Sequence, residues 1–163
     1  MLWSYGRIKM KMIKITFVCY GNICRSPLAE FVFRDLIEEK GLSDKVFVNS
    51  KATSDEEVGN PVYPQVKRIL DRMGIDCSKK RAEKLEQIDY DKSDLFIGMD
   101  NQNIRDIKRI FGGDPKNKVK RLMDFANEDK EISDPYWTRD FEECFCDIVR
   151  GTKGLYEKIK DEI

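Results

Sequence analysis

Apolar and polar residues alternate along the chain in a pattern that predicts a regular series of strands and helices. Four short runs rich in β-branched and other apolar residues predict strands at residues 13–18, 45–50, 93–100 and 118–125. Apolar residues that recur every three or four positions predict helices at residues 26–40, 62–73, 101–111 and 140–163. Strands that alternate with helices favour a parallel sheet with right-handed crossovers. The pattern therefore predicts a small doubly wound α/β fold, in which a four-stranded parallel sheet is flanked by helices in three α/β/α layers.

Length and charge restrict the organisation of the chain further. One domain of ordinary size accounts for most of the 163 residues, and we expect it to span residues 13–163. Residues 1–12 are basic and lightly apolar, with too short an apolar run for a signal peptide or a membrane span, so we expect an irregular N-terminal extension. The 30 basic and 30 acidic residues are interspersed, which argues against nucleic-acid binding. These features predict a cytoplasmic monomer that binds neither nucleic acid nor membrane.

Two features of the composition limit the chemistry. The chain has no histidine, which excludes a histidine general base, a dyad of histidine with serine or cysteine, and any metal site with a histidine ligand. Its five cysteines are an odd number without the spacing of a disulfide scaffold, which points to a reducing compartment. Cys144 and Cys146 lack a second pair that would complete a zinc site, and we expect one in the core and one at the surface. We therefore expect neither a metal nor a cofactor.

The chemically richest stretch is 18–27, where a predicted buried strand ends at Cys19 and a predicted helix begins at Ser26. A short loop between a strand and a helix N-terminus presents backbone N–H groups without partners, and the helix dipole adds positive potential there. Gly21 and Asn22 tolerate the backbone conformations that such a loop needs to curl around an oxyanion. The stretch is therefore predicted to bind an anion of the size of phosphate.

Arg25 and Cys19 add charge and a nucleophile to this predicted anion site. The guanidinium fork of Arg25 can hold two oxygens at once, which a lysine cannot do. A thiol at a helix N-terminus and beside a guanidinium is commonly a thiolate at neutral pH. A thiolate at the centre of a phosphate cradle indicates attack on phosphorus and a cysteinyl-phosphate intermediate.

The spacing Cys-x5-Arg-Ser, with Gly-Asn-Ile-Cys inside it and a strand before it, closely resembles the motif of the low-molecular-weight protein tyrosine phosphatases. The resemblance runs from about Ile13 to the C-terminus. It implies that Cys19 is the nucleophile and that Arg25 binds phosphate. The phosphate-binding loop would then consist of Tyr20, Gly21, Asn22, Ile23, Cys24 and Arg25.

The resemblance also implies supporting roles around this loop. Asn22 would hold the loop in shape, Ser26 would tune the thiolate, and Ser50, at the end of the second strand, would hydrogen-bond Asn22. Cys24 would lie beside Cys19, near enough for a reversible disulfide. Members of the family commonly carry a histidine soon after the glycine that ends the second helix. Because this chain has no histidine, one supporting hydrogen bond must be absent or rebuilt.

A second motif, Asp134-Pro135-Tyr136-Trp137, resembles the family's Asp-Pro-Tyr loop. The ester oxygen that leaves phosphorus needs a proton, and without histidine an aspartate over the site is the natural donor. Proline limits backbone freedom and so helps to hold that acid in one geometry. We therefore expect Asp134 to be the general acid and base. Asp100, which resembles the aspartate of the family's Met-Asp segment, is expected to cap the following helix.

The rim of the pocket is implied by the same resemblance. It would consist of Tyr20, Glu56, Tyr136 and Trp137, with Glu57 as the alternative to Glu56. Three aromatic side chains can form a slot that matches a phenyl ring. The expected substrates are therefore phosphotyrosine-containing proteins or small aryl phosphates, with inorganic phosphate as product. A carboxylate at the mouth would favour basic residues beside the phosphotyrosine.

Two other functions stay open on the sequence alone. The same oxyanion loop would suit an arsenate reductase, which would need a relay of further thiols such as Cys77, Cys144 and Cys146. The spacing of these cysteines does not indicate a dedicated pair, and such a reductase needs no Asp-Pro-Tyr acid. A non-catalytic phosphotyrosine-binding module would need neither Cys19 nor Asp134. The sequence therefore favours a phosphatase.

Overall fold

The computed structural model describes residues 12–163, so the expected N-terminal extension lies outside the described residues except for Met12. Four parallel strands form a sheet at its centre, in the order β2-β1-β3-β4. The strands are β1 (Ile13–Cys19), β2 (Val46–Ala52), β3 (Leu95–Gly98) and β4 (Val119–Arg121). This arrangement confirms the predicted four-stranded parallel sheet.

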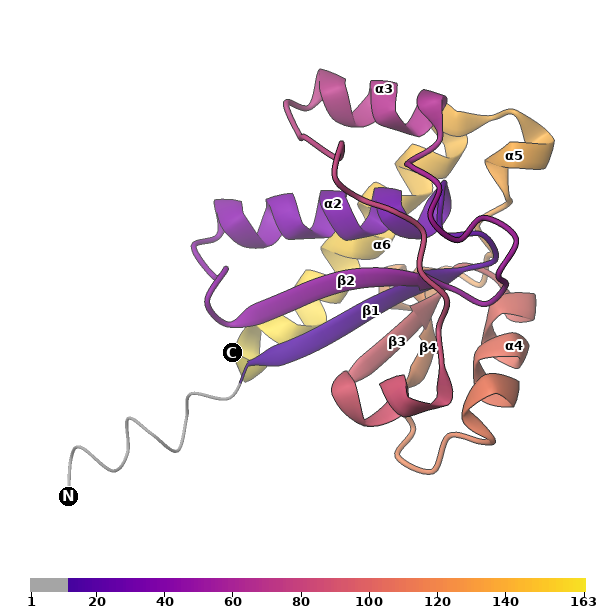
Figure 1. Ribbon diagram of the computed structural model, residues 1–163. Helices are drawn as coiled ribbons and strands as arrows, with labels where there is room; N and C mark the ends of the chain where they lie inside the picture. The colour runs from indigo at the N-terminus through magenta and orange to yellow at the C-terminus, as the bar shows by residue number, and fades with distance from the viewer. Residues whose placement is uncertain (1–11) are drawn as a thin grey trace.

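Helices cover both faces of the sheet (Figure 1). The face with α2 (Arg25–Glu39) and α6 (Phe141–Ile159) also carries α3 (Pro64–Arg72) and α5 (Pro135–Thr138), and the other face carries α4 (Asn101–Phe111). Three short 3-10 helices complete the elements: η1 (Gln87–Lys92), η2 (Leu122–Ala126) and η3 (Lys160–Glu162). The three predicted layers are confirmed. No helix within residues 12–163 is both long and apolar enough to cross a membrane.

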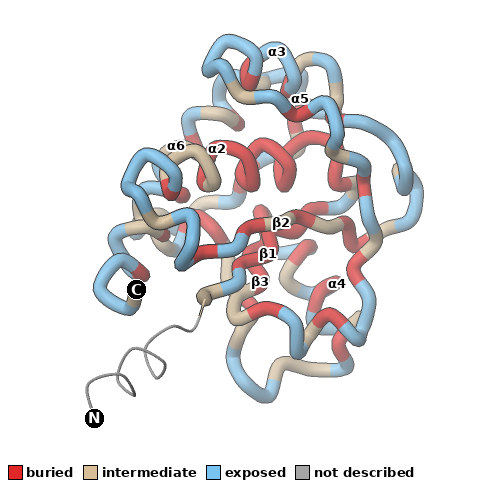
Figure 2. Tube along the Cα trace, turned by 60° about the vertical axis from the view of Figure 1, so that its left-hand side comes forward, coloured by how far each residue is buried: buried red, intermediate tan, exposed pale blue. Residues whose placement is uncertain are grey.

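Two apolar clusters hold the layers together. The larger cluster lies on the α2 and α6 side and includes Phe17 and Phe33, whose rings meet edge to face at 5.8 Å. The smaller cluster lies beneath α4 and includes Phe96 and Phe111, whose ring centroids are 4.7 Å apart. Figure 2 shows that burial is concentrated in the inner strands and in α2. Strand β1 is buried over its last five residues because helices cover both of its faces, and it ends at Cys19.

The prediction of a strand through residue 125 was wrong. Strand β4 covers three residues, and the chain then turns into η2. Two glycines of α6 explain this path, because they bring the helix into direct contact with η2. A Cβ atom on Gly154 would lie 2.0 Å from the carbonyl oxygen of Phe125, and one on Gly151 would lie 2.5 Å from Leu122. The chain therefore leaves the sheet after β4 and packs as η2 directly against α6.

Candidate active site

Two loops meet at the carboxyl edge of the sheet. The first, which we call the thiol loop, comprises residues 19–26: the last residue of β1, the connection to α2 and the first two residues of α2. The second, which we call the Asp-Pro loop, comprises residues 133–140 and contains α5. A cavity of about 170 Å³ lies between them. This edge is where open α/β sheets generally bind their ligands.

The thiol of Cys19 has three potential hydrogen-bond donors within the thiol loop. The backbone N–H groups of Asn22 and Ser26 donate to Sγ across 3.3 and 3.4 Å, and Oγ of Ser26 lies 3.0 Å from it. Because Oγ of Ser26 already accepts a hydrogen bond from Nδ2 of Asn22, its own proton is free for the sulfur. Donors that converge on a sulfur stabilise its thiolate form. The geometry therefore suits a nucleophilic thiolate.

Asn22 holds the thiol loop from within. It has a left-handed backbone with φ 59°, which asparagine tolerates better than most residues, and its side chain is buried. Its Nδ2 donates to Oγ of Ser26 at 2.8 Å and to Oγ of Ser50 at 2.9 Å, and its Oδ1 accepts the backbone N–H of Glu83 at 3.0 Å. Both amide hydrogens and the oxygen thus have partners. The contact between Asn22 and Ser50 is the one that the resemblance implied.

Behind Ser50 lies a cluster of buried charges that the sequence analysis missed. The hydroxyl of Ser50 donates to Oε1 of Glu30 at 2.5 Å, although Glu30 is only 4% exposed. Arg34 pairs with the other oxygen of this carboxylate. Nζ of Lys80 lies 3.5 Å from Oε1 of Glu30 and donates to the carbonyl oxygen of Ser50 at 2.9 Å. A lysine thus supports Ser50 from the segment where a histidine was expected by resemblance. The spacing of Glu30 and Arg34, one helical turn apart, could have predicted their ion pair from the sequence. No local pattern could have predicted the contacts of Lys80 with Glu30 and Ser50.

Arg25 places a fixed cation beside the thiol. Its Nη1 donates to Oδ2 of Asp100 at 2.7 Å and to the carbonyl oxygen of Ile132 at 2.9 Å, and its Nη2 lies 3.5 Å from Oδ2 of Asp134. Burial by itself would lower the pKa of Arg25, but Cys19 and Asp100 raise it above its ordinary value. The guanidinium is therefore charged, buried and held in one orientation.

Asp100 has two roles, of which the sequence predicted one. Its Oδ1 accepts the backbone N–H of Asn103 at 2.7 Å, which confirms the expected cap of α4. Its Oδ2 holds Arg25, a contact that the sequence analysis missed. The signal for it was the position of Asp100 soon after β3, because neighbouring parallel strands end at the same edge of a sheet.

Asp134 caps the single turn of α5. Its Oδ1 accepts the backbone N–H of Tyr136 at 3.0 Å, whereas its Oδ2 faces Arg25. Pro135 is the first residue of α5, where a missing N–H costs nothing. The side chain of Asp134 is 27% exposed and lines the cavity, so the cap and Arg25 orient the carboxylate while the cavity still reaches it.

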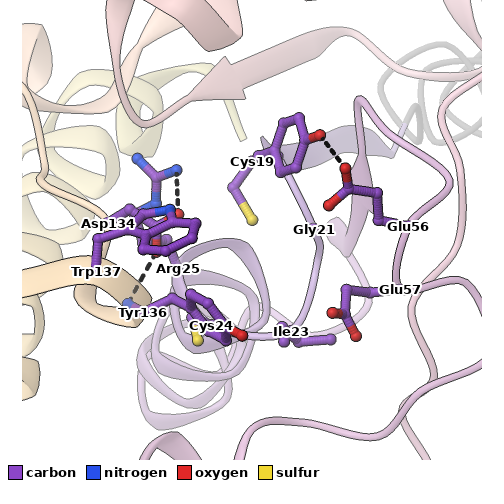
Figure 3. A pocket seen from close by; sticks show the side chains of 11 residues that line it. Cys19, Gly21, Ile23, Cys24, Arg25, Glu56, Glu57, Asp134, Tyr136 and Trp137 are labelled. Carbon is purple, nitrogen blue, oxygen red and sulfur yellow. Dashed lines mark hydrogen bonds and ion pairs between the residues drawn. The ribbon is translucent and has the colours of Figure 1, made fainter. Parts of the chain in front are cut away.

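The four residues expected at the rim all line the cavity between the two loops. Figure 3 shows Glu56 and Glu57 on one side of Cys19, and Asp134, Tyr136 and Trp137 on the other. The hydroxyl of Tyr20 donates to Oε1 of Glu56 at 2.7 Å, and this carboxylate raises the pKa of Tyr20. The complete lining is Cys19, Tyr20, Gly21, Ile23, Cys24, Arg25, Glu56, Glu57, Asp134, Tyr136 and Trp137. Both glutamates considered for the mouth therefore face the cavity.

The other thiols differ in their surroundings. Burial, followed by the nearby Cys19, raises the pKa of Cys24, and burial raises the pKa of Cys144 to about 12. Cys146 is exposed, so the pair Cys144 and Cys146 divides between core and surface as predicted. Cys19 and Cys24 are both free thiols, and their reversible disulfide stays a prediction. Within the described part of the chain, no three acidic or cysteine side chains are grouped so that they could hold a metal ion.

Similarity to known proteins covers almost the whole chain. The sequence model of the family described as "Low molecular weight phosphotyrosine protein phosphatase" matches residues 14–163. Over 154 residues the chain is 37% identical to low molecular weight protein-tyrosine-phosphatase YfkJ of Bacillus subtilis, covering 93% of this chain and 98% of that protein. Over 152 residues it is 35% identical to low molecular weight phosphotyrosine protein phosphatase of Sus scrofa, covering 90% and 95%.

Solved structures show the same relationship. The crystal structure of YfkJ from Bacillus subtilis matches with a TM-score of 0.90 and 38% identity, covering 93% of this chain and 97% of that one. The structure of a low molecular weight protein tyrosine phosphatase from Streptococcus pyogenes matches with a TM-score of 0.82 and 32% identity, covering 91% and 93%. On these grounds the chain belongs to the low molecular weight protein tyrosine phosphatase family of enzymes.

Proposed function

We propose that the chain hydrolyses phosphotyrosine in proteins through a cysteinyl-phosphate intermediate, with Cys19 as nucleophile and Asp134 as general acid and base. The observation that carries this proposal is the position of Sγ of Cys19 among three hydrogen-bond donors. Arg25 and Asp134 face the same cavity, and their Nη2 and Oδ2 atoms lie 3.5 Å apart. Membership of the family supports the same reaction.

In the first step, the thiolate of Cys19 attacks phosphorus, so that an S–P bond forms as the P–O bond to the tyrosyl oxygen breaks. Asp134 gives its proton to the leaving phenolate oxygen. Arg25 and the backbone N–H groups of the thiol loop hold the equatorial oxygens of phosphate. They contact these oxygens more tightly as charge develops in the transition state.

In the second step, Asp134 is a carboxylate and takes a proton from water as that water attacks phosphorus. The S–P bond breaks, inorganic phosphate leaves and the thiolate of Cys19 is restored. The hydroxyl of Ser26, 3.0 Å from Sγ, stabilises the thiolate as a leaving group. Asp134 therefore gives a proton in one step and regains one in the next.

The aromatic walls support phosphotyrosine as the substrate. Tyr20, Tyr136 and Trp137 all line the cavity and can enclose a phenyl ring. A phosphate group borne on a ring reaches Cys19 through this slot, whereas the shorter side chain of phosphoserine does not. Small aryl phosphates are substrates by the same argument, and the slot makes phosphoserine a poor one.

The carboxylates at the mouth support a preference for basic sequences around the phosphotyrosine. Glu56 is held by the hydroxyl of Tyr20, and Oε2 of Glu57 is held at 2.6 Å by Asn60. Two fixed negative charges attract lysine or arginine in the substrate and repel acidic residues. The balanced, interspersed charge supports action on phosphoproteins rather than on nucleic acid or a membrane. Five cysteines without a disulfide scaffold support a cytoplasmic location, and we propose that the chain acts there as a monomer.

The two alternatives are not favoured. The relatives are named as phosphatases, and the burial of Cys144 disfavours the thiolate that an arsenate reductase relay would need. A binding module would have no use for an acid opposite a thiol. Among the functions considered, phosphatase activity alone uses Cys19, Arg25 and Asp134 together.

Turnover of p-nitrophenyl phosphate without added metal tests the proposal. We expect Cys19→Ser to abolish turnover but to retain phosphate binding, because backbone N–H groups and Arg25 form the cradle. Binding can be measured by calorimetry with inorganic phosphate. Hydrolysis by this variant at more than about a hundredth of the wild-type rate would exclude Cys19 as the nucleophile.

A further inference from the structure

Arg139 adopts a backbone conformation that its residue type rarely takes. It follows α5 directly and has a left-handed φ of 64°. Among the described non-glycine residues, the other three with positive φ are the asparagines Asn22, Asn117 and Asn127. Asparagine tolerates this region and arginine gains nothing from it. A strained residue of this kind persists where its surroundings hold it, and such residues gather at functional sites.

The contacts of Arg139 show what holds it. Its guanidinium lies over the rings of Tyr63 and Phe141, at 5.5 and 5.2 Å from their centroids. Its Nη1 also donates to the hydroxyl of Tyr63 at 3.0 Å. Its backbone N–H donates to the carbonyl oxygen of Pro135 at 2.9 Å and so closes the single turn of α5. The side chain of Arg139 therefore fastens the end of the Asp-Pro loop to Tyr63.

Tyr63 in turn contacts the thiol loop. Its backbone N–H donates to the carbonyl oxygen of Ile23 at 2.9 Å. Its ring meets the ring of Tyr136 edge to face at 5.7 Å and stacks on Phe141 at 5.8 Å. Tyr63 precedes α3 directly, so it belongs to neither loop but is bonded to both. Through Tyr63 the segment that carries the acid is tied to the segment that carries the nucleophile.

We propose that Tyr63 and Arg139 form a brace that positions Asp134 over the thiol loop for proton transfer. Because α5 is one turn of four residues, with Asp134 capping one end and Arg139 closing the other, a shift of Arg139 moves the acid. A general acid must lie within hydrogen-bond reach of the atom that it protonates. Both residues are positioning residues, and the inference rests on the role of Asp134 proposed above.

The brace is tested by the dependence of kcat/KM on the leaving group. A series of aryl phosphates with good and poor leaving groups is compared in the wild type, Arg139→Gly, Arg139→Lys and Tyr63→Phe. Glycine adopts φ 64° without strain, so Arg139→Gly removes the guanidinium and keeps the backbone. Tyr63→Phe removes the hydroxyl and keeps the ring and the backbone hydrogen bond to Ile23. The rate of alkylation of Cys19 by iodoacetamide is measured in parallel.

We expect Arg139→Gly to lower kcat/KM about tenfold for phenyl phosphate and much less for p-nitrophenyl phosphate, since small displacements of a catalytic group are costly. Tyr63→Phe has a smaller effect in the same direction, and Arg139→Lys restores part of the loss. A double variant that combines Arg139→Gly with Tyr63→Phe loses no more than Arg139→Gly alone, because both substitutions break one unit. Alkylation of Cys19 stays unchanged throughout.

Two control variants separate the brace from general effects. Asn127→Gly introduces glycine at the left-handed residue that follows η2, and Arg105→Gln removes an exposed guanidinium from α4. Both should retain the wild-type dependence on the leaving group. Equal losses for good and poor leaving groups in Arg139→Gly and Tyr63→Phe, no loss in either, or slowed alkylation of Cys19 would refute the brace. An inactive wild type would instead refute the proposed function.

Discussion

The thiol loop and the Asp-Pro loop face the same cavity, but they are held in different ways. In the thiol loop, Asn22, Cys24 and Ser26 are at most 4% exposed, and the loop is fixed by hydrogen bonds within a buried network. In the Asp-Pro loop, Tyr136 is 42% exposed and Trp137 is 78% exposed. Aromatic contacts, the guanidinium of Arg139 and the ion pair between Asp134 and Arg25 hold this second loop at the surface.

This difference matches what each loop has to do in the proposed reaction. Stabilising the charge on phosphate requires donors that are already oriented before the substrate arrives, and burial provides this. Recognising a protein substrate requires accessible side chains, which tolerate substitution more readily than buried ones. Substitutions at the buried residues of the thiol loop should therefore affect all substrates alike, whereas Tyr20, which is 42% exposed, belongs with the residues that contact the substrate. Substitutions in the Asp-Pro loop should affect substrates according to their leaving group or shape.

The strongest test of this contrast is Asp134→Asn. The amide cannot supply the proton, so we expect kcat to fall by about 10²–10⁴-fold. The loss in kcat/KM should be larger for poor leaving groups than for good ones. If the loss is the same across a series of aryl phosphates, Asp134 is not the acid.

Arg25→Lys tests the buried side of the comparison. The charge is kept but the fork is lost, so we expect kcat/KM to fall by about 10²–10³-fold for good and poor leaving groups alike. Steady-state kinetics on the same aryl phosphates measures this. If kcat/KM of Arg25→Lys is close to that of the wild type, Arg25 stabilises the fold and does not bind phosphate.

Lys80→Met asks whether the thiol loop depends on the charges behind it. The substitution leaves the buried carboxylate of Glu30 with one cation fewer, although Arg34 remains. We therefore expect the free energy of unfolding to fall by about 1–3 kcal/mol. Urea unfolding measures the change. Lys79→Met, at an exposed neighbouring lysine, is the control. Equal stability of the two variants would mean that Lys80 contributes nothing to the support of Ser50.

Glu56→Gln should have the smallest effect and the greatest dependence on substrate. In the wild type, phosphotyrosine peptides with flanking lysine or arginine should be hydrolysed with a higher kcat/KM than peptides with flanking acidic residues. The substitution should narrow this gap by about two- to fivefold at low salt, where exposed charges are least screened. Equal kcat/KM for basic and acidic peptides in the wild type at low ionic strength would remove the electrostatic preference.

Local sequence pattern was enough to predict the sheet, its parallel strands and the two motifs. It could identify Cys19, Arg25 and Asp134 as candidates because each lies in a motif whose spacing has a chemical meaning. Asp100 was predicted as a cap because an N-cap is also a local feature. Its pairing with Arg25 joins positions 75 residues apart, and such a contact leaves no periodic signal.

What the sequence could not show was how distant segments pack. The end of β4 at residue 121 depends on where α6 approaches, and the contact of Lys80 with Ser50 depends on the path of a loop without regular pattern. The left-handed backbone of Arg139 contradicts the preference of its residue type, so propensity argued against it. Each of these features is set by tertiary contacts that override local preference.

The two glycines of α6 also bear on the order in which the protein folds. Each costs the helix about 1 kcal/mol relative to alanine, so α6 is a weak helix in isolation. It becomes favourable when η2 is in place to receive it, since Gly154 fits against the backbone of Phe125. We therefore expect α6 to form late in folding, after β1, β3 and β4 have assembled. In a refolding experiment, the formation of α6 should then be among the last steps.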